Sequence, residues 1–337
     1  MSDKESPFHF GMFTSDDVRT AHISGPTFSN KKVSYCVVDG RCYVEGCIDI
    51  GSVEEVAAQE RSLAVQDKSS LEKGVGRSGD EYRWPNGLIP YLIDSTLPSQ
   101  SRVTSAIAHW ETNTKFRFIE RTSTNASSYP NYIRFRPSTG CSSSVGMRGG
   151  EQFINLASGC STGSTIHEIG HAIGLWHEQS REDRDNYVTI NWDNIESGKS
   201  HNFDQHITDG DDLGSYDFGS IMHYSEYAFS KNGEPTITTK PAGQAIGQRA
   251  GLSAADIAAA HALYKFWYSN TAVLQTYSTY HSKNAWGYLQ GLGWRKIYPD
   301  NASAVSNVFV ALCEAKANGR NTNVYADGEH IYRAYLN

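Results

Sequence analysis

The stretch that most constrains this chain reads HEIGHAIGLWH and begins at His167. His167 and His171 are four positions apart, so on a helix both imidazoles project from one face at the spacing that grips one metal ion. Glu168 is displaced around that helix and can reach a water beside the ion. Gly174 can take a positive backbone angle, which ends the helix and brings in His177 as a third nitrogen ligand. Three nitrogens leave a fourth position open, and this is typical of a catalytic zinc site.

Length and charge narrow the class of protein further. The chain has 337 residues, which favours two or three folded units over a single core. A net charge of −7 gives no basic surface for nucleic acid, and no apolar run approaches the roughly 18 residues that a membrane span needs. Abundant glycine and tyrosine suit a loop-rich secreted protein. The opening residues MSDKESPFHF lack the features of a signal peptide, so we expect any leader to have been removed on export or left out.

Changes of composition along the chain predict three regions. Residues 1–75 are polar and irregular apart from one amphipathic patch, residues 76–265 form the main domain, and residues 266–337 form a tail. Apolar residues at helical spacing predict helices, and alternating or short apolar runs beside turn residues predict strands. The expected helices cover residues 52–65, 101–114, 253–264 and 308–319, and the expected strands cover residues 88–94, 132–137 and, around a turn, 322–336.

A second motif strengthens the interpretation as a metal site. Residues 219–225 read GSIMHYS, which resembles the Met-turn of the metzincins, where a methionine packs as an apolar floor beneath the zinc. Met222 would be that methionine. From His167 to Asp185 the chain also matches HExxHxxGxxHExxRxDRD at every fixed position. With SIMHY this is the astacin signature, so the chain resembles an astacin-family zinc metalloprotease.

This resemblance implies an α+β fold, a two-lobed astacin-like metzincin catalytic domain with zinc in the cleft. An irregular inhibitory propeptide would precede that domain, and a small mixed C-terminal domain of unknown role would follow it. The segment between Cys141 and Cys160 resembles the family's disulfide-bounded stretch, whose edge strand borders the substrate cleft, so these two cysteines would form that disulfide. The family's second disulfide has no matching cysteines in this chain.

The resemblance also implies roles for two further residues. Tyr224 would be a catalytic phenol that ligates zinc in the mature resting enzyme and swings away to bond the oxyanion. Glu178 would be the buried carboxylate that anchors the new amino terminus after cleavage near Gly74–Gly76. Without the resemblance, a tyrosine in such a turn would be read as a packing residue.

Three of the six cysteines lie together in CVVDGRCYVEGC, residues 36–47. Astacin propeptides carry the motif FxGDI, whose aspartate fills the open zinc position, and VEGCI lies where that motif belongs with Cys47 in place of the aspartate. Thiolate is a strong zinc ligand, so we expect Cys47 to be the latch and Cys36 and Cys42 to bridge each other. Two alternatives stay open: Cys47 could pair with one of those cysteines, and Asp49 could be the ligand.

These assignments predict a secreted zinc endopeptidase, made as a latent monomeric precursor with its own propeptide as inhibitor. One zinc ion would be held by the three histidines, and Glu168 would take a proton from the water that attacks a peptide carbonyl. Protein or peptide substrates are the expected partners, with no nucleic acid and no membrane. A zinc-bearing binding protein is disfavoured by the intact Glu168, and a non-proteolytic zinc hydrolase is disfavoured by the Met-turn.

Overall fold

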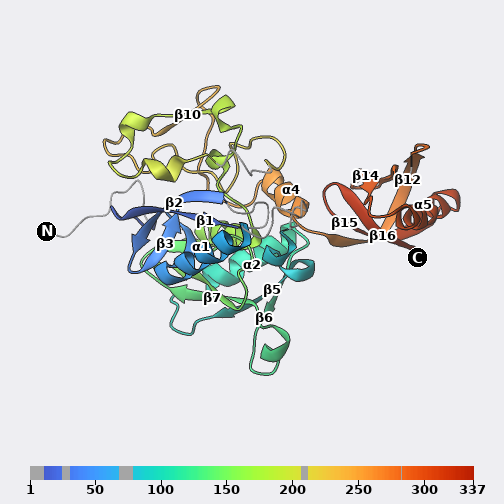
Figure 1. The fold of residues 1–337 in the computed structure, drawn as a ribbon, viewed down its shortest axis with the longest axis horizontal. Helices are drawn as coiled ribbons and strands as arrows, with labels where there is room; N and C mark the ends of the chain where they lie inside the picture. Colours follow the sequence, from blue (N-terminus) through green and yellow to red (C-terminus); the bar gives the residue numbers. More distant parts are fainter. Residues whose placement is uncertain (1–10, 25–30, 68–78, 206–211, 282) are drawn as a thin grey trace. The chain divides into compact units, whose positions relative to one another are not determined.

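The chain divides into two compact units, Met1–Ala260 and His261–Asn337. Among the described residues, no helix is both long enough and apolar enough to cross a membrane. The computed structural model (Figure 1) describes residues 11–24, 31–67, 79–205, 212–281 and 283–337.

The first unit is built on a nine-stranded sheet in the order β1-β2-β3-β4-β8-β9-β7-β5-β6. Strands β6, β5, β7 and β9 run parallel to one another, whereas β8 is antiparallel to β9. Ile89, Ile133 and Ile154, one from each of three parallel strands, are fully buried, which is the pattern of a sheet covered on its faces. The strands are β1 (Val18–Ile23), β2 (Lys31–Val38), β3 (Arg41–Val44), β4 (Ile48–Ser52), β5 (Leu88–Ile93), β6 (Arg117–Glu120), β7 (Tyr132–Pro137), β8 (Cys141–Ser143) and β9 (Glu151–Leu156).

The N-terminal segment differs from the irregular structure that the sequence predicted. Its described part forms strands β1 to β4 and helix α1 (Val53–Asp67), the one element expected there. Ile48 of β4 pairs in parallel with Ser143 of β8, so this segment extends the main sheet. Val44 and Ile48 also share a buried cluster with Val145 of the main domain. The segment is therefore packed into the first unit.

Helix α3 (Thr162–Ile173) carries the first two histidines and packs against α2 (Ser101–Asn113) and strands β8 and β9. Ser161 caps its N-terminus by accepting a hydrogen bond from the Ser164 amide. The Trp110 indole of α2 donates to the Ile166 carbonyl at 3.1 Å, which fixes one helix against the other. These contacts fix the position of the helix that carries the two histidines.

The other half of the first unit is rich in loops and short 3-10 turns (Figure 1). Its core is an aromatic and aliphatic cluster that includes Phe203, Tyr224 and Phe229. Strands β10 (Val188–Ile190) and β11 (Ile237–Thr239) pair within it, and helix α4 (Ala254–Ala262) closes the unit. In the described parts of the first unit as a whole, the 3-10 turns are η1 (Asp80–Tyr82), η2 (Pro85–Gly87) and η3 (Ala126–Ser128), among the sheet strands, and η4 (Glu178–Ser180), η5 (Arg184–Asn186), η6 (Trp192–Asn194) and η7 (Ser200–Phe203), in the loop-rich half.

The second unit is a closed five-stranded barrel in the order β12-β13-β14-β16-β15. Strands β14 and β16 are parallel, and the other neighbouring pairs are antiparallel. A helix inserted between the third and fourth strands of such a barrel is the arrangement of OB folds. The elements are β12 (Phe266–Ser278), β13 (Ala285–Leu289), β14 (Gly293–Ile297), α5 (Ala302–Ala317), β15 (Asn321–Ala326) and β16 (His330–Leu336).

Candidate metal centre and active site

Helix α3 presents His167 and His171 from one face, and both imidazoles are buried. The Nδ1 of His167 donates to the Ile221 carbonyl at 2.8 Å, and the Nδ1 of His171 donates to the Leu175 carbonyl at 2.8 Å. Because a carbonyl can only accept, each ring keeps its Nε2 unprotonated and available to a metal. These two Nε2 atoms lie 3.1 Å apart.

His177 reaches the same point after the chain turns at Gly174, whose φ is 127°. Its Nε2 lies 3.3 Å from that of His167. Its Nδ1 lies 2.5 Å from the Glu45 carboxylate, which comes from the N-terminal segment and is fully buried. The third histidine is therefore oriented by a carboxylate that belongs to a different part of the chain.

Cys47 completes the cluster. Its Sγ lies 3.3 Å from the Nε2 atoms of His171 and His177 and 3.8 Å from that of His167. All four ligand atoms lie within 4.8 Å of one another, and all four residues are buried. In a tetrahedral zinc site, nitrogen ligands should be about 3.3 Å apart and sulfur and nitrogen about 3.6 Å apart. The donor set and its spacing thus fit one zinc ion.

Burial also makes this cluster dependent on a cation. It lowers the pKa values of His167 and His171 well below the ordinary value for histidine and raises the pKa of Cys47 well above that of a free thiol. A thiolate at this depth needs a compensating positive charge; the neutral imidazoles do not provide one, and the charge of Arg249 offsets the effect of burial on the pKa of Cys47 only in part. A bound metal ion would provide it.

Glu168 lies beside the cluster and is buried. Among the described residues, its Oε2 has no hydrogen-bond partner, which suits a carboxylate that receives a water or a substrate group. Burial raises its pKa well above the ordinary value, and the charge of Arg249 opposes this shift. The Arg249 guanidinium also donates to the Ile221 carbonyl, the acceptor of His167.

Met222 lies directly under helix α3. A Cβ added to Gly170 would come within 2.7 Å of the Met222 sulfur, so an alanine there would require the methionine side chain to shift. The preceding turn is anchored by Asp256 of α4, which accepts hydrogen bonds from the Ser220 hydroxyl and the Ile221 amide. The turn therefore connects α4 with the floor of the cluster.

Tyr224 is fully buried, with its ring centroid 4.6 Å from that of His177. Its hydroxyl donates to the backbone carbonyl of Glu45 at 2.7 Å. In this structure the phenol is therefore bonded to the N-terminal segment.

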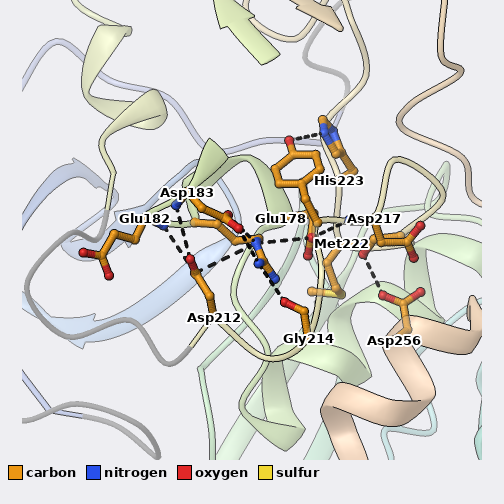
Figure 2. A network of polar contacts seen from close by, with 12 residues as sticks. Glu178, Glu182, Asp183, Asp212, Gly214, Asp217, Met222, His223 and Asp256 are labelled. Atoms are coloured by element: carbon orange, nitrogen blue, oxygen red, sulfur yellow. Dashed lines mark hydrogen bonds and ion pairs between the residues drawn. The ribbon is translucent and has the colours of Figure 1, made fainter. Parts of the chain in front are cut away.

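Glu178 belongs to a polar network beside the Met-turn (Figure 2), and its amide donates to the Met222 carbonyl at 3.2 Å. Its Oε1 accepts a hydrogen bond from the Asp217 amide at 2.8 Å, and Arg181 approaches the same oxygen to 3.6 Å. Burial raises its pKa to about 7. A cavity of about 30 Å³ adjoins Glu178, Asp217 and Asp256. The expected cleavage region, Gly74–Gly76, lies outside the described residues.

The cysteines give one agreement and one correction. Cys141 and Cys160 form the expected disulfide, with an S–S distance of 2.01 Å. The expected bridge between Cys36 and Cys42 is wrong, since both thiols are free. Cys36 pairs across the strands with Tyr43, so these two side chains share one face of the sheet. Cys42 precedes Tyr43 on β3 and therefore points to the opposite face. Accordingly, the two thiols lie in different buried clusters.

Asp49, the alternative ligand, does not lie in the cluster. Its carboxylate is paired with the Arg41 guanidinium at 2.8 Å. The residue that sequence reasoning missed is Glu45, two positions before Cys47 in VEGCI. Its carboxylate gave no motif to recognise, because its role depends on a contact with a histidine 132 positions away.

These features define a zinc-metalloprotease domain of the metzincin type: a zinc helix with two histidines, a third histidine after a glycine turn, and a methionine floor. A family model described as Astacin (Peptidase family M12A) matches residues 76–265. That match covers more than half of the chain, and the chain belongs to the astacin family.

Individual proteins are also similar to this chain. Blastula protease 10 of Paracentrotus lividus is 44% identical over 228 residues, which cover 64% of this chain and 38% of that protein. Meprin A subunit beta of Homo sapiens is 36% identical over 231 residues, covering 65% of this chain and 32% of that protein. The solved structure of High choriolytic enzyme 1, a hatching enzyme zinc-protease from Oryzias latipes, matches at 37% identity with a TM-score of 0.49 and covers 54% of this chain and 94% of that one. The chain thus spans about a third of the length of the first two relatives.

Proposed function

We propose that this chain is the latent precursor of a secreted zinc endopeptidase, silenced by Cys47. The observation that carries the proposal is the position of the Cys47 sulfur, 3.3 Å from two of the three histidine nitrogens. In a catalytic zinc site that position belongs to water or substrate. A precursor with the Cys47 sulfur at that position would hold the metal but would leave no place for the attacking water, so it could not hydrolyse a peptide.

His167, His171 and His177 would hold the metal in both the precursor and the mature enzyme. When bound, zinc supplies a Lewis acid that lowers the pKa of water toward about 7 and polarises the peptide carbonyl. Glu168 acts as general base, removes a proton from the attacking water and returns it to the leaving amine. Its buried, unpartnered Oε2 is suited to that transfer.

Tyr224 supports the oxyanion once the precursor is opened. In the precursor its hydroxyl is held by the Glu45 carbonyl, so removal of the N-terminal segment frees it. The phenol would then be free to ligate the metal in the resting enzyme and to donate a hydrogen bond to the oxyanion of the substrate. Met222 remains as the apolar floor.

The N-terminal segment inhibits in two further ways. Strand β4 pairs with β8 through Ile48 and Ser143. It thereby covers the strand edge along which a substrate would bind. Glu45 orients His177 and so stabilises the metal in the latent form. The segment therefore excludes the substrate while it protects the site.

Activation requires cleavage near residue 75. The new amino terminus would approach Glu178, where the small adjoining cavity and a carboxylate of raised pKa suit an incoming ammonium group. The substrates are proteins or peptides, and the enzyme is monomeric. Secretion is supported by the Cys141–Cys160 disulfide, because such bonds persist in oxidising compartments.

Replacement of Cys47 by alanine tests the proposal. Cys47→Ala should give an uncleaved precursor that hydrolyses casein slowly or cleaves itself, whereas Cys36→Ala and Cys42→Ala are matched controls that stay latent. Activity should disappear on zinc chelation in every form. A Cys47→Ala precursor that binds zinc, folds and remains as inactive as the parent would show that the pairing of β4 with β8 maintains latency alone and that the sulfur is not what silences the enzyme.

A further inference from the structure

The barrel of the second unit reverses the usual placement of aromatic residues. Aromatic side chains normally contribute much of a protein core, because each buries a large apolar area. Here the fully buried cluster inside the barrel is aliphatic, and most of the rings lie outside it. The buried members are Val273, Ala285, Leu289, Ile297, Val305, Leu312, Ala315, Val324, Ala326 and Ile331.

One group of outward side chains forms a continuous surface across three neighbouring strands. Cross-strand pairing puts them in two rows of three, one row containing a glutamine and two rings and the other containing two rings and a lysine. We call this surface the aromatic platform. Its members are Gln275, Tyr288 and Trp294 in the first row and Tyr277, Trp286 and Lys296 in the second.

The strand pattern fixes the direction in which these side chains point. On β13, Gly287 faces the core, since a Cβ there would lie 2.9 Å from a Leu312 methyl group. Trp286 and Tyr288, on either side of Gly287, therefore point outward. The barrel interior is filled by other residues, so packing inside it does not require these rings.

The rings contact one another but stay accessible. Tyr277 and Trp286 have centroids 5.5 Å apart with planes 41° apart, and Tyr288 and Trp294 have centroids 5.4 Å apart with planes 66° apart. Tyr277 is 55% exposed and Trp294 is 44% exposed. Contiguous exposed apolar surface of this kind marks an interaction site.

We propose that the aromatic platform binds a neutral polysaccharide chain. Pyranose rings offer apolar C–H faces that stack on aromatic rings and hydroxyl groups that form hydrogen bonds with polar side chains. Gln275 and Lys296 lie at opposite corners of the platform, where they can form such hydrogen bonds. The tilt between neighbouring rings suits one flexible chain better than the flat face of a crystalline polymer.

The charges on the platform argue against the main alternative. A nucleic acid strand carries one phosphate per base, and proteins that stack its bases line the backbone with several cations. Lys296 is the one charged member of the platform, and its Nζ already lies over the Trp286 ring at 5.5 Å from the centroid. The second and third strands of an OB barrel bind both oligonucleotides and oligosaccharides, so the place on the barrel does not separate the two, and the argument rests on the side chains.

Affinity electrophoresis of the full-length precursor tests this proposal. The gels would contain laminarin, xylan, mixed-linkage β-glucan or glycol chitin, and a parallel assay would use single-stranded oligothymidine. We expect retardation by at least one polysaccharide, unchanged in 0.5 M salt. Retardation by none of the four, or binding of oligothymidine in their place, would overturn the proposal.

Variants identify the surface responsible. Tyr277→Ala and Trp294→Ala should each weaken polysaccharide binding about 3- to 10-fold, the range expected for loss of one aromatic contact. Trp294→Phe keeps a ring and should retain most of the binding, which separates loss of stacking from loss of folding. Trp267→Ala is the matched control, because Trp267 is 41% exposed on the same barrel but lies outside the platform. Equal weakening by Trp267→Ala would contradict the assignment to the platform.

Discussion

Each histidine of the metal centre is oriented by a different acceptor. Carbonyl groups of the main domain hold His167 and His171, whereas the carboxylate of Glu45 holds His177. A carboxylate makes a histidine ligand more basic than a carbonyl does, and such partners commonly change metal affinity by about 10- to 100-fold. The precursor should therefore hold zinc more tightly than the mature enzyme for this reason as well as through the sulfur.

Glu45→Gln tests that contribution. The amide keeps the shape and can still accept a hydrogen bond but loses the charge, so we expect the precursor to lose zinc to a chelator about 10-fold faster, with Cys47 unchanged. The measurement is release of zinc to a colorimetric chelator. Zinc release from Glu45→Gln as slow as from the parent precursor would contradict the role of Glu45.

Glu168→Gln should separate metal binding from chemistry. We expect the variant to fold and to contain one zinc per chain, because the carboxylate lies beside the ligand cluster and outside it. Peptide hydrolysis by the activated form should fall about 10²- to 10⁴-fold, the usual contribution of a general base. Activity within about tenfold of the parent would exclude this role, and loss of zinc would make the carboxylate a ligand.

The free thiols give a prediction about alkylation. Burial raises the pKa of Cys42 to about 11 and also raises that of Cys36, so at pH 8 both remain protonated and unreactive. Iodoacetamide should then label the half-buried Cys313 first and reach Cys36 and Cys42 only on unfolding or as the pH rises toward 11. A disulfide-linked peptide joining Cys36 to Cys42 in a mass spectrum would restore the original expectation.

At the residue level, the sequence predicted what a single helix and its turn determine. The spacing of His167 and His171 already places two ligands on one face, and Gly174 indicates where the chain turns. The Cys36–Cys42 bridge was mispredicted because closeness in sequence says nothing about which face of a sheet each thiol takes. Glu45 was missed because a buried carboxylate acquires its role only from tertiary contact.

At the level of elements, helix α3 depends on two glycines that make room for its neighbours. A Cβ on Gly163 would lie 1.8 Å from the Arg249 backbone oxygen, whereas one on Gly170 would meet the Met222 sulfur at 2.7 Å. A backbone atom cannot move aside as the end of a methionine side chain can. The two positions should therefore respond differently to the same substitution.

Gly163→Ala should destabilise the precursor by about 2 kcal/mol or more, because overpacking outweighs the roughly 1 kcal/mol that alanine gains in helix propensity. Gly170→Ala should cost clearly less, since Met222 can adjust. Urea unfolding of both variants and the parent provides the comparison. The explanation fails if Gly163→Ala is the milder of the two.

The main helices and strands were predicted well, and the N-terminal strands were not. The helices expected at residues 52–65 and 101–114 correspond to α1 and α2, and the strand at 132–137 corresponds to β7. Strands β1 to β4 have short alternating patterns and gain their stability from the sheet that they extend, a long-range pairing that local periodicity cannot reveal. The barrel closure was missed for the same reason.

At the scale of the whole molecule, the two units have separate cores, and the metal centre lies within the first one. Calorimetry of the full chain should show that zinc removal lowers the unfolding temperature of one transition and leaves the other unchanged. The first unit should lose about 4 kcal/mol if zinc is present at a thousand times its dissociation constant. A single transition that shifts as a whole would show that the units do not unfold independently.

The most direct test of the latent metal centre is zinc K-edge X-ray absorption of the intact precursor, repeated after removal of residues 1–75. We expect one sulfur at about 2.3 Å and three nitrogens at about 2.0 to 2.1 Å in the precursor. The sulfur should vanish from the spectrum after cleavage. A precursor whose zinc has only nitrogen and oxygen neighbours would contradict the assignment of Cys47 as the latch.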